Sequence, residues 1–202
     1  MAGLVATNYE GNPKMSEKVR VEVKKLHPDA VIPKYQNPGD AGFDIHACIS
    51  IEEAIASCVM RAAVDLDFNH KLKVLDTSVA GYCVKKENRS IWVGPQTQLI
   101  VSTGLAFSVP PGFELQIRPR SGLASKQKLT ITNAPGTLDS GYSGEMKIIL
   151  FNLGNKDIEI KHGDRIAQGV VGIVPSVNLV EVSKLSNEDS ERGTGGFGST
   201  GR

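Results

Sequence analysis

Two arginines and a serine near the middle of the chain have the chemistry to bind an anion. In Arg118-Pro119-Arg120-Ser121-Gly122, the Pro and Gly predict a turn in which backbone N–H groups lie beside guanidinium and hydroxyl donors. Such a cluster suits a phosphate group. The same residues also fit the basic end of an ordinary surface strand, and this motif alone does not decide between the two interpretations.

An acid and an aromatic residue stand in a second candidate segment, Asn133-Ala-Pro-Gly136-Thr-Leu-Asp139-Ser-Gly-Tyr142. Its glycines, Asn and Pro predict a hairpin. A hairpin can present backbone donors and acceptors to a planar base, with Tyr142 beneath a sugar and Asp139 near a water. The simpler interpretation makes Asp139 a turn residue and Tyr142 an edge aromatic. Further on, Gly163–Gln168 adds an acid–base pair and an amide, which equally fit a salt-bridged turn.

The last sixteen residues, Asn187–Arg202, are rich in glycine and include Arg192 and Phe197. Such a composition cannot build a core, so we expect a loose segment in the absence of ligand. A lone Phe and two Arg among glycines suit a flap that folds over a ligand. The formal G-x-G-x-x-G within it is not a dinucleotide fingerprint, because that motif needs a strand before it and a helix after it.

The elements that must position these residues are mostly short strands. Short alternating or apolar runs that end at Gly, Pro or Asn are typical of an all-β sandwich or barrel. The first predicted strand begins at Arg20. The later ones are Gln98–Val109, Phe113–Arg118, Lys147–Phe151, Ile158–Ile160, Ile166–Val174 and Leu179–Val182. Residues 1–19 are unpatterned and predict a flexible arm. Within Glu53–Asp67, four apolar residues at helical spacing (Ile55, Val59, Ala62 and Leu66) predict a helix that packs onto the body, in preference to a groove for a partner.

Composition narrows the class of protein. A formal net charge of +1 over 202 residues predicts no general attraction to nucleic acid or membrane, so anion binding must be local. Three cysteines without C-x-x-C spacing indicate reduced thiols more than a zinc site. No signal-like or membrane-spanning stretch is found, and we expect an intracellular, cytoplasmic protein (host cytoplasm if viral).

Taken together and in order, five segments resemble the signature motifs of the dUTPase family: Ala41–Asp44, Arg120–Gly122, Asn133–Tyr142, Gly163–Gln168 and Arg192–Thr200. The resemblance covers about 21–51 and 93–202. It implies a jelly-roll-type β-barrel that forms a homotrimer, with active sites between subunits. The implied reaction is the hydrolysis of dUTP to dUMP and pyrophosphate.

The resemblance also implies roles for single residues. Asp139 would activate the attacking water, and Asp44 would act on Mg²⁺ indirectly through water, with the metal held mainly by the triphosphate. The hairpin would read uracil, Tyr142 would exclude a 2′-hydroxyl, and the tail would close as a lid. The implied substrate-binding residues are Arg120, Ser121, Gly122, Asn133, Gly136, Thr137, Leu138, Tyr142, Lys147, Gln168, Arg192, Phe197 and Gly198.

Two features depart from that pattern or compete with it. Compared with the family pattern, about forty residues are added at about 53–92, and this added segment leaves room for a protein partner. The segment lies inside a predicted β domain over 20–186, which precedes the predicted mobile lid at 187–202. The rival is dCTP deaminase, which shares the fold and the trimer. That family has a catalytic Glu at the position of Ile149, and an Ile cannot transfer protons.

Overall fold

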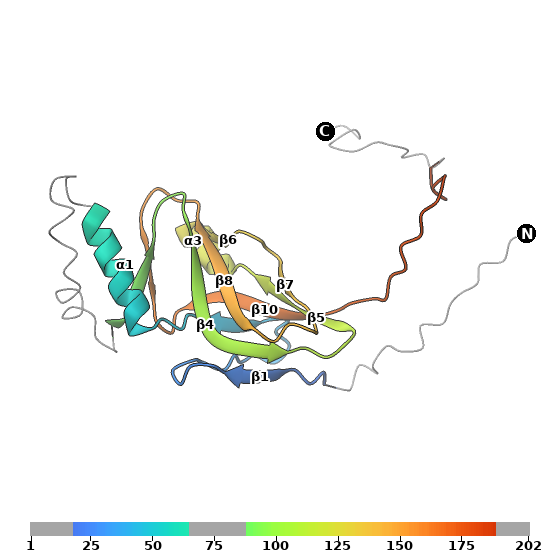
Figure 1. The fold of residues 1–202 in the computed structure, drawn as a ribbon, viewed down its shortest axis with the longest axis horizontal. Coiled ribbons are helices and arrows are strands. Elements are labelled where there is room, and N and C mark those ends of the chain that lie inside the picture. Colours follow the sequence, from blue (N-terminus) through green and yellow to red (C-terminus); the bar gives the residue numbers. More distant parts are fainter. Residues whose placement is uncertain (1–17, 65–87, 189–202) are drawn as a thin grey trace, which may run out of the picture.

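The computed structural model describes residues 18–64 and 88–188, and these form two four-stranded antiparallel sheets with a two-stranded ribbon beside them (Figure 1). The first sheet has the order β1 (Glu22–Lys25), β4 (Gln98–Ser108), β8 (Glu145–Asn152) and β6 (Leu129–Ile131). The second has the order β2 (Phe43–His46), β10 (Arg165–Ile173), β5 (Phe113–Arg118) and β7 (Gly136–Leu138). The ribbon pairs β3 (Ser90–Val93) with β9 (Ile158–Lys161).

One hydrophobic core draws on both sheets. Side chains alternate along the strands, so that Met146, Ile148 and Leu150 of β8 are buried while Lys147 between them is exposed. Ile45 and Leu115 of the second sheet join the same core cluster. The predicted all-β class is confirmed as a mostly β fold. Among the described residues, the hydrogen-bonded ladders do not close into a barrel.

The predicted strand at Leu179–Val182 is wrong. From Val174 the chain leaves the body beside β5 and β10 and runs outward (Figure 1). Its apolar side chains have no surface of their own chain to cover, and Leu179 is 91% exposed. An alternating apolar pattern specifies a strand only when a partner edge is available, and the described part of this chain offers none.

The turn predicted at Arg118–Ala124 is also corrected. After Pro119 the chain enters a short helix, α3 (Ser121–Gln127), with Arg120 at its N-cap. Leu123, Ala124 and the residues that follow favour helix, and this preference outweighs the turn tendency of a single Gly. The backbone N–H groups of Ser121 and Gly122 have no acceptor among the described residues, because the first turn of a helix has no intrahelical acceptors for them.

The segment 133–144 is not the predicted hairpin. Its one strand, β7, pairs with β5 of the second sheet, whereas the preceding β6 and the following β8 belong to the first sheet. Gly136 and Leu138 of β7 both face inward, so docking on β5 buries Leu138 in the core, and that burial favours the crossing over a local hairpin. The segment therefore spans the two sheets at one edge.

The predicted helix is confirmed as α1 (Ile51–Val64), which starts two residues earlier than expected. A capping box explains the start: the Ser50 N–H donates to Glu53 Oε2 at 2.8 Å, and the Glu53 N–H donates to Ser50 Oγ at 3.0 Å. Ala54 is fully buried, and the Trp92 N–H of β3 donates to Ser57 Oγ at 3.1 Å. The first half of α1 thus packs onto the body, the arrangement that we expected in preference to a groove for a partner.

Leu66, the last residue of the predicted apolar stripe, lies outside the described residues. None of the described helices is long and apolar enough to cross a membrane.

The stability of the fold should depend on pH through His162. Its Nδ1 accepts the Ile49 N–H at 3.1 Å, and burial, with a smaller contribution from Arg89, holds the pKa of the imidazole below its ordinary value. The unfolded chain therefore binds a proton more readily than the native one as pH falls through about 6.5. We expect the melting temperature to fall between pH 7.5 and pH 5.5, measured by thermal unfolding at fixed protein concentration. His162→Gln should flatten this dependence; an unchanged slope would contradict the assignment.

Candidate active site

The central strand β10 brings three of the predicted motifs into one place. Gln168 of β10 lies opposite Asp44 of β2 on one side and opposite Arg118 of β5 on the other. Arg120 follows two residues after β5. Around them is an open hollow of about 370 Å³, which we call the arginine hollow, lined by Gln36, Asn37, Asp40, Ala41, Gly42, Asp44, Arg120, Ser121, Gly122, Arg165 and Gln168.

Asp44 holds two arginines at the wall of this hollow. Its Oδ1 accepts Arg120 Nε at 2.7 Å and its Oδ2 accepts Arg165 Nη1 at 3.1 Å. Asp44 is 8% exposed, whereas the side chains of Arg120 and Arg165 are 25% and 49% exposed. The buried carboxylate is therefore neutralised, and the partly exposed guanidinium groups keep further N–H donors for an anion in the hollow.

Two neighbours support this arrangement. A Cβ on Gly42 would approach Gln168 Oε1 and Gly169 O to 3.2 Å, so the absence of a side chain lets β2 and β10 lie close together here. His46 lies behind the ion pairs, where burial, with Arg165 and Arg120 acting against Asp44, lowers the pKa of its imidazole. A neutral His46 adds no positive charge beside the two arginines. Gln168 Nε2 donates to Pro119 O at 2.8 Å, which fixes its amide.

A second hollow, of about 580 Å³, opens beside β7 and β8, and we call it the tyrosine hollow. It has more apolar wall than the arginine hollow. Tyr142 is 46% exposed and its hydroxyl donates to Glu145 O at 2.9 Å. The lining residues are Ile100, Ile117, Ile131, Asn133, Gly136, Thr137, Leu138, Tyr142, Glu145, Met146, Lys147, Ile148 and Ile149.

The structure therefore divides the predicted site residues into two groups. Five line the arginine hollow and six line the tyrosine hollow, and no residue lines both: Asp44, Arg120, Ser121, Gly122 and Gln168 form the first group, and Asn133, Gly136, Thr137, Leu138, Tyr142 and Lys147 form the second. Asp139, directly after β7, is exposed and lines neither hollow. Arg192, Phe197 and Gly198 lie outside the described residues.

The side chains at these hollows could assist in binding a metal ion but do not form a metal site by themselves. The part of the chain that the structure describes contains no cluster of three or more His, Cys, Asp or Glu side chains able to hold an ion. Both carboxylate oxygens of Asp44 already accept from arginines. Mg²⁺ requires about six oxygen ligands. These residues fit a metal whose ligands come mainly from the substrate and from water.

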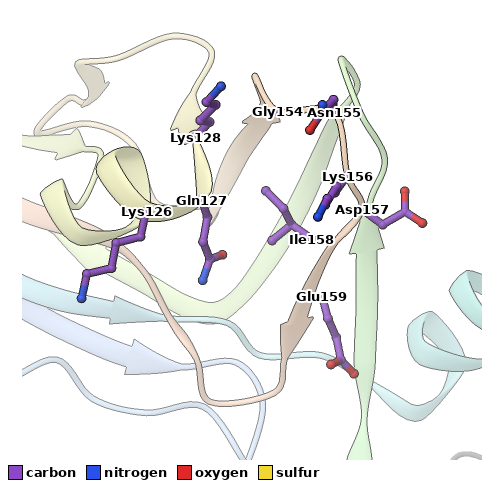
Figure 2. A pocket seen from close by; sticks show the side chains of 9 residues that line it. All are labelled: Lys126, Gln127, Lys128, Gly154, Asn155, Lys156, Asp157, Ile158 and Glu159. Carbon is purple, nitrogen blue, oxygen red and sulfur yellow. The ribbon is translucent and has the colours of Figure 1, made fainter.

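A third hollow, of about 410 Å³, lies away from all the predicted motifs, between the end of α3 and β9 (Figure 2). Lys126, Lys128 and Lys156 line it, and none of the three forms an ion pair within the described residues. Lys156 points into the space, while Asp157 points away from it (Figure 2). The lining includes no residue of the first two hollows, so this hollow is separate from them.

Comparison with known proteins decides between the families considered. The dUTPase family model matches residues 73–201. A deoxyuridine 5′-triphosphate nucleotidohydrolase of Wolinella succinogenes is 42% identical over 190 residues, which are 93% of this chain and 99% of that protein. This chain belongs to the dUTPase family. A second family member, the enzyme of the same name from Nautilia profundicola, is 40% identical over 91% of this chain and 100% of its own length.

Solved structures of phage dUTPases share the fold. The dUTPase of Staphylococcus bacteriophage 80alpha with dUPNHPP has a TM-score of 0.62 and 25% identity, covering 91% of this chain and 99% of that one. A mutant dUTPase of phage phi11, described with a structural Mg(II) ion, has a TM-score of 0.59 at 20% identity and covers 82% and 97%. The second likeness concerns the fold alone.

The extra segment at about 53–92 is not peculiar to this chain. The Wolinella succinogenes alignment takes in 93% of this chain and 99% of the relative within 190 residues, which leaves no room for a forty-residue gap. This family member therefore has a segment of comparable length between the first two motifs.

Two acidic residues at the hollows are not among the predicted site residues. Glu145 follows the third motif and lines the tyrosine hollow, and Asp40 precedes the first motif and lines the arginine hollow. A carboxylate next to a glycine-rich motif was the available signal for both, but which face of a strand it occupies becomes clear only from strand pairing.

Proposed function

We propose that this chain hydrolyses dUTP to dUMP and pyrophosphate at sites shared between the subunits of a homotrimer of jelly-roll-type chains. This activity limits uracil in DNA and supplies dUMP for thymidylate synthesis. The observation that carries the proposal is the division of the motif residues between two hollows, one cationic and one more apolar. A nucleoside triphosphate has the same two ends, and two neighbouring chains would together offer both.

The C-terminal segment supports assembly through more than one chain. Five apolar side chains between 177 and 185 are more than half exposed on a segment that leaves its own body: Val177, Leu179, Val180, Val182 and Leu185. Exposed apolar side chains in a row indicate a surface that binds another protein. Packed on a neighbour, the segment would bring Arg192, Phe197 and Gly198 to a site that is not built by its own chain.

The arginine hollow would hold the triphosphate. Arg120 uses N–H groups on Asp44 and on Arg165 O, at 2.7 and 3.2 Å, and the remaining ones are available for phosphate oxygens. Arg165, the N–H groups of Ser121 and Gly122, and Gln168 would complete the binding of the phosphates. A highly charged anion on a chain of net charge +1 requires this local concentration of donors.

The tyrosine hollow would hold deoxyuridine. The backbone around Asn133, Gly136 and Leu138, with Thr137, would read the uracil edge, and the narrow space would exclude the methyl group of thymine. Tyr142 would pack under the deoxyribose and leave no room for a 2′-hydroxyl. Lys147, with its side chain 52% exposed at this hollow, would add positive charge near the nucleotide.

Asp139 would act as the general base. Its carboxylate has no hydrogen bond or ion pair within the described part of the chain, so both oxygens are available to a water. The water oxygen forms a bond to the α-phosphorus while the bond to the pyrophosphate oxygen breaks in line, and the water proton passes to Asp139. Mg²⁺, held mainly by the triphosphate, would neutralise the developing charge, and Asp44 would assist indirectly through water.

The tail would complete the site as a lid. Phe197 would stack on the uracil, Arg192 would bind the γ-phosphate, and Gly198 would allow the close approach. Closing the lid expels water and strengthens each charged contact inside the site.

A pyrophosphate-release assay that compares dUTP, dTTP, UTP and dCTP tests the proposed function. We expect turnover of dUTP alone, and equal turnover of dUTP and UTP would exclude the proposed pocket. Release of ammonia from dCTP would instead indicate deamination. That outcome is opposed by Ile149, which lines the tyrosine hollow where the deaminase family has its catalytic Glu.

We also propose that the segment at about 53–92 binds a protein partner in addition to packing on the body. Phage dUTPases of the same fold are described as controlling the transfer of virulence genes and as having a species-specific insert. In this chain α1 lies on the opposite side of the body from the point where the C-terminal segment leaves (Figure 1), so a partner at α1 would not cover that point. Deletion of 65–87, which leaves α1 and β3 with their packing on the body, should keep dUTP turnover and abolish capture of the partner; unchanged capture would contradict the proposal.

A further inference from the structure

Glu145 connects β4 to two residues that line the tyrosine hollow. It is the first residue of β8, and its side chain is 24% exposed. Its Oε1 accepts the Gly104 N–H at 2.9 Å, its Oε2 lies 3.6 Å from Lys147 Nζ, and its backbone oxygen accepts the Tyr142 hydroxyl at 2.9 Å. Two of these three partners, Tyr142 and Lys147, line the hollow together with Glu145.

The Gly104 contact is a rigid anchor. The register of β4 against β8 shifts between Ser102 and Ala106, and Gly104 lies in this irregularity at φ +64. A Cβ there would lie 2.9 Å from Cys48 Sγ, and Gly104 O accepts the Leu26 N–H at 2.8 Å, so neighbouring segments hold the backbone in place. The shift deprives the Gly104 N–H of a ladder acceptor, and the Glu145 carboxylate supplies one.

The hydrogen bond from the Tyr142 hydroxyl to Glu145 O holds the Tyr142 ring, which otherwise packs against Gly144 on one side. A Cβ on Gly144 would lie 2.7 Å from Tyr142 Oη and 2.8 Å from its Cζ, so the ring crosses the glycine directly. The other face of the ring remains open to the hollow. The hydrogen bond from the hydroxyl to Glu145 O therefore determines the orientation of the ring relative to the backbone.

These contacts form one mechanical connection from β4 to the wall of the hollow. The carboxylate of Glu145 ties the start of β8 to the irregularity in β4, and the carbonyl of the same residue then holds the phenol ring. The second carboxylate oxygen draws the Lys147 amine to the same wall. Because Glu145 bonds its partners with both the side chain and the backbone, loss of the side chain should loosen the ring as well as the amine.

We propose that Glu145 is a positioning residue that sets the discrimination between deoxyribose and ribose, by holding Tyr142 and Lys147 at the wall of the nucleoside pocket. This inference rests on the proposed hydrolysis of dUTP. Glu145 acts through Tyr142 and Lys147, because its carboxylate oxygens are already engaged by the Gly104 N–H and the Lys147 amine. An aromatic ring excludes one hydroxyl group only if its position is held within a fraction of an ångström.

The test compares three variants by steady-state kinetics with dUTP and UTP. Glu145→Ala removes the anchor, and we expect the ratio of kcat/KM for dUTP over UTP to fall about tenfold, the effect of one hydrogen bond to a charged group, mainly through a higher KM for dUTP. Glu145→Gln keeps an oxygen for the Gly104 N–H and should retain most of the ratio. Tyr142→Phe should lower the ratio, and its effect should not add to that of Glu145→Ala.

Glu159→Ala is the matched control, because Glu159 is a half-buried glutamate of β9 that lies 3.8 Å from Lys161 at the separate hollow of Figure 2. We expect its ratio to equal that of the unmodified protein. Additive effects of Tyr142→Phe and Glu145→Ala, or an unchanged ratio in Glu145→Ala, would overturn the inference. If Glu145→Ala does not fold, a retained ratio in both Glu145→Gln and Tyr142→Phe overturns it. Absence of dUTP hydrolysis by the unmodified protein would instead overturn the proposed function.

Discussion

Asp139→Asn should lower kcat for dUTP by roughly 10²–10⁴-fold while dUTP binding is largely kept. The change replaces a carboxylate that can take a proton with an amide of nearly the same shape that cannot. The carboxylate of Asp139 has no hydrogen bond or ion pair to lose within the described residues, and its backbone oxygen still accepts the Tyr142 N–H at 3.0 Å, so the fold should be unaffected. Pyrophosphate release measures kcat, and titration with a non-hydrolysable dUTP analogue measures binding.

Asp157→Asn serves as the control for the same substitution away from the proposed site, because Asp157 is an exposed carboxylate at the separate hollow of Figure 2. Its kcat should match that of the unmodified protein. A kcat near normal in Asp139→Asn would remove the role of general base from this residue. A parallel loss of binding and turnover would show instead that Asp139 holds the nucleotide.

Mixing two inactive variants should restore activity if the site is shared between chains. Arg120→Ala removes a guanidinium group from the arginine hollow and should cost roughly 10²–10³-fold in kcat. Asp139→Asn disables the segment beside the tyrosine hollow. In trimers assembled from equal amounts of the two, about a quarter of the sites combine an intact hollow from each chain, so activity should rise far above that of either variant.

The pairing of Arg120→Ala with Asp44→Asn provides the control. Both changes affect the arginine hollow, in which Asp44 accepts Arg120 Nε at 2.7 Å, so no mixed site contains an intact copy of that hollow. This mixture should stay as inactive as its components. If the first mixture also stays inactive although the chains have assembled together, each site lies within a single chain and the proposed arrangement is wrong.

The chemistry and the local structure followed from short stretches of sequence. The helical spacing of the apolar residues after Glu53 predicted α1, because a helix depends on neighbours three and four residues apart, and the capping box of Ser50 and Glu53 seen in the structure explains its earlier start. Alternation along Phe113–Arg118 predicted β5, and runs rich in apolar residues predicted β4 and β8. The motifs identified the family that the 42% identical relative confirms.

Errors arose where the outcome depended on what lies beside a segment. Leu179–Val182 alternates like a strand but has no partner edge within the described chain. The 133–144 segment has the composition of a hairpin, yet its strand pairs with β5 because Leu138 gains burial there. The pattern of apolar and polar residues alone does not specify the neighbour with which a strand will pair.

By itself, the sequence determined the residue types of the site, their order and most of the surrounding strands, because side-chain periodicity acts over a few residues. Only the tertiary structure decided that Asp44 would clamp Arg120, 76 residues away, and that Glu145 would reach Gly104, 41 residues away. It also decided that the motif residues would form two separate hollows. Such pairings depend on strand order and register, which are settled when the two sheets bury a common core.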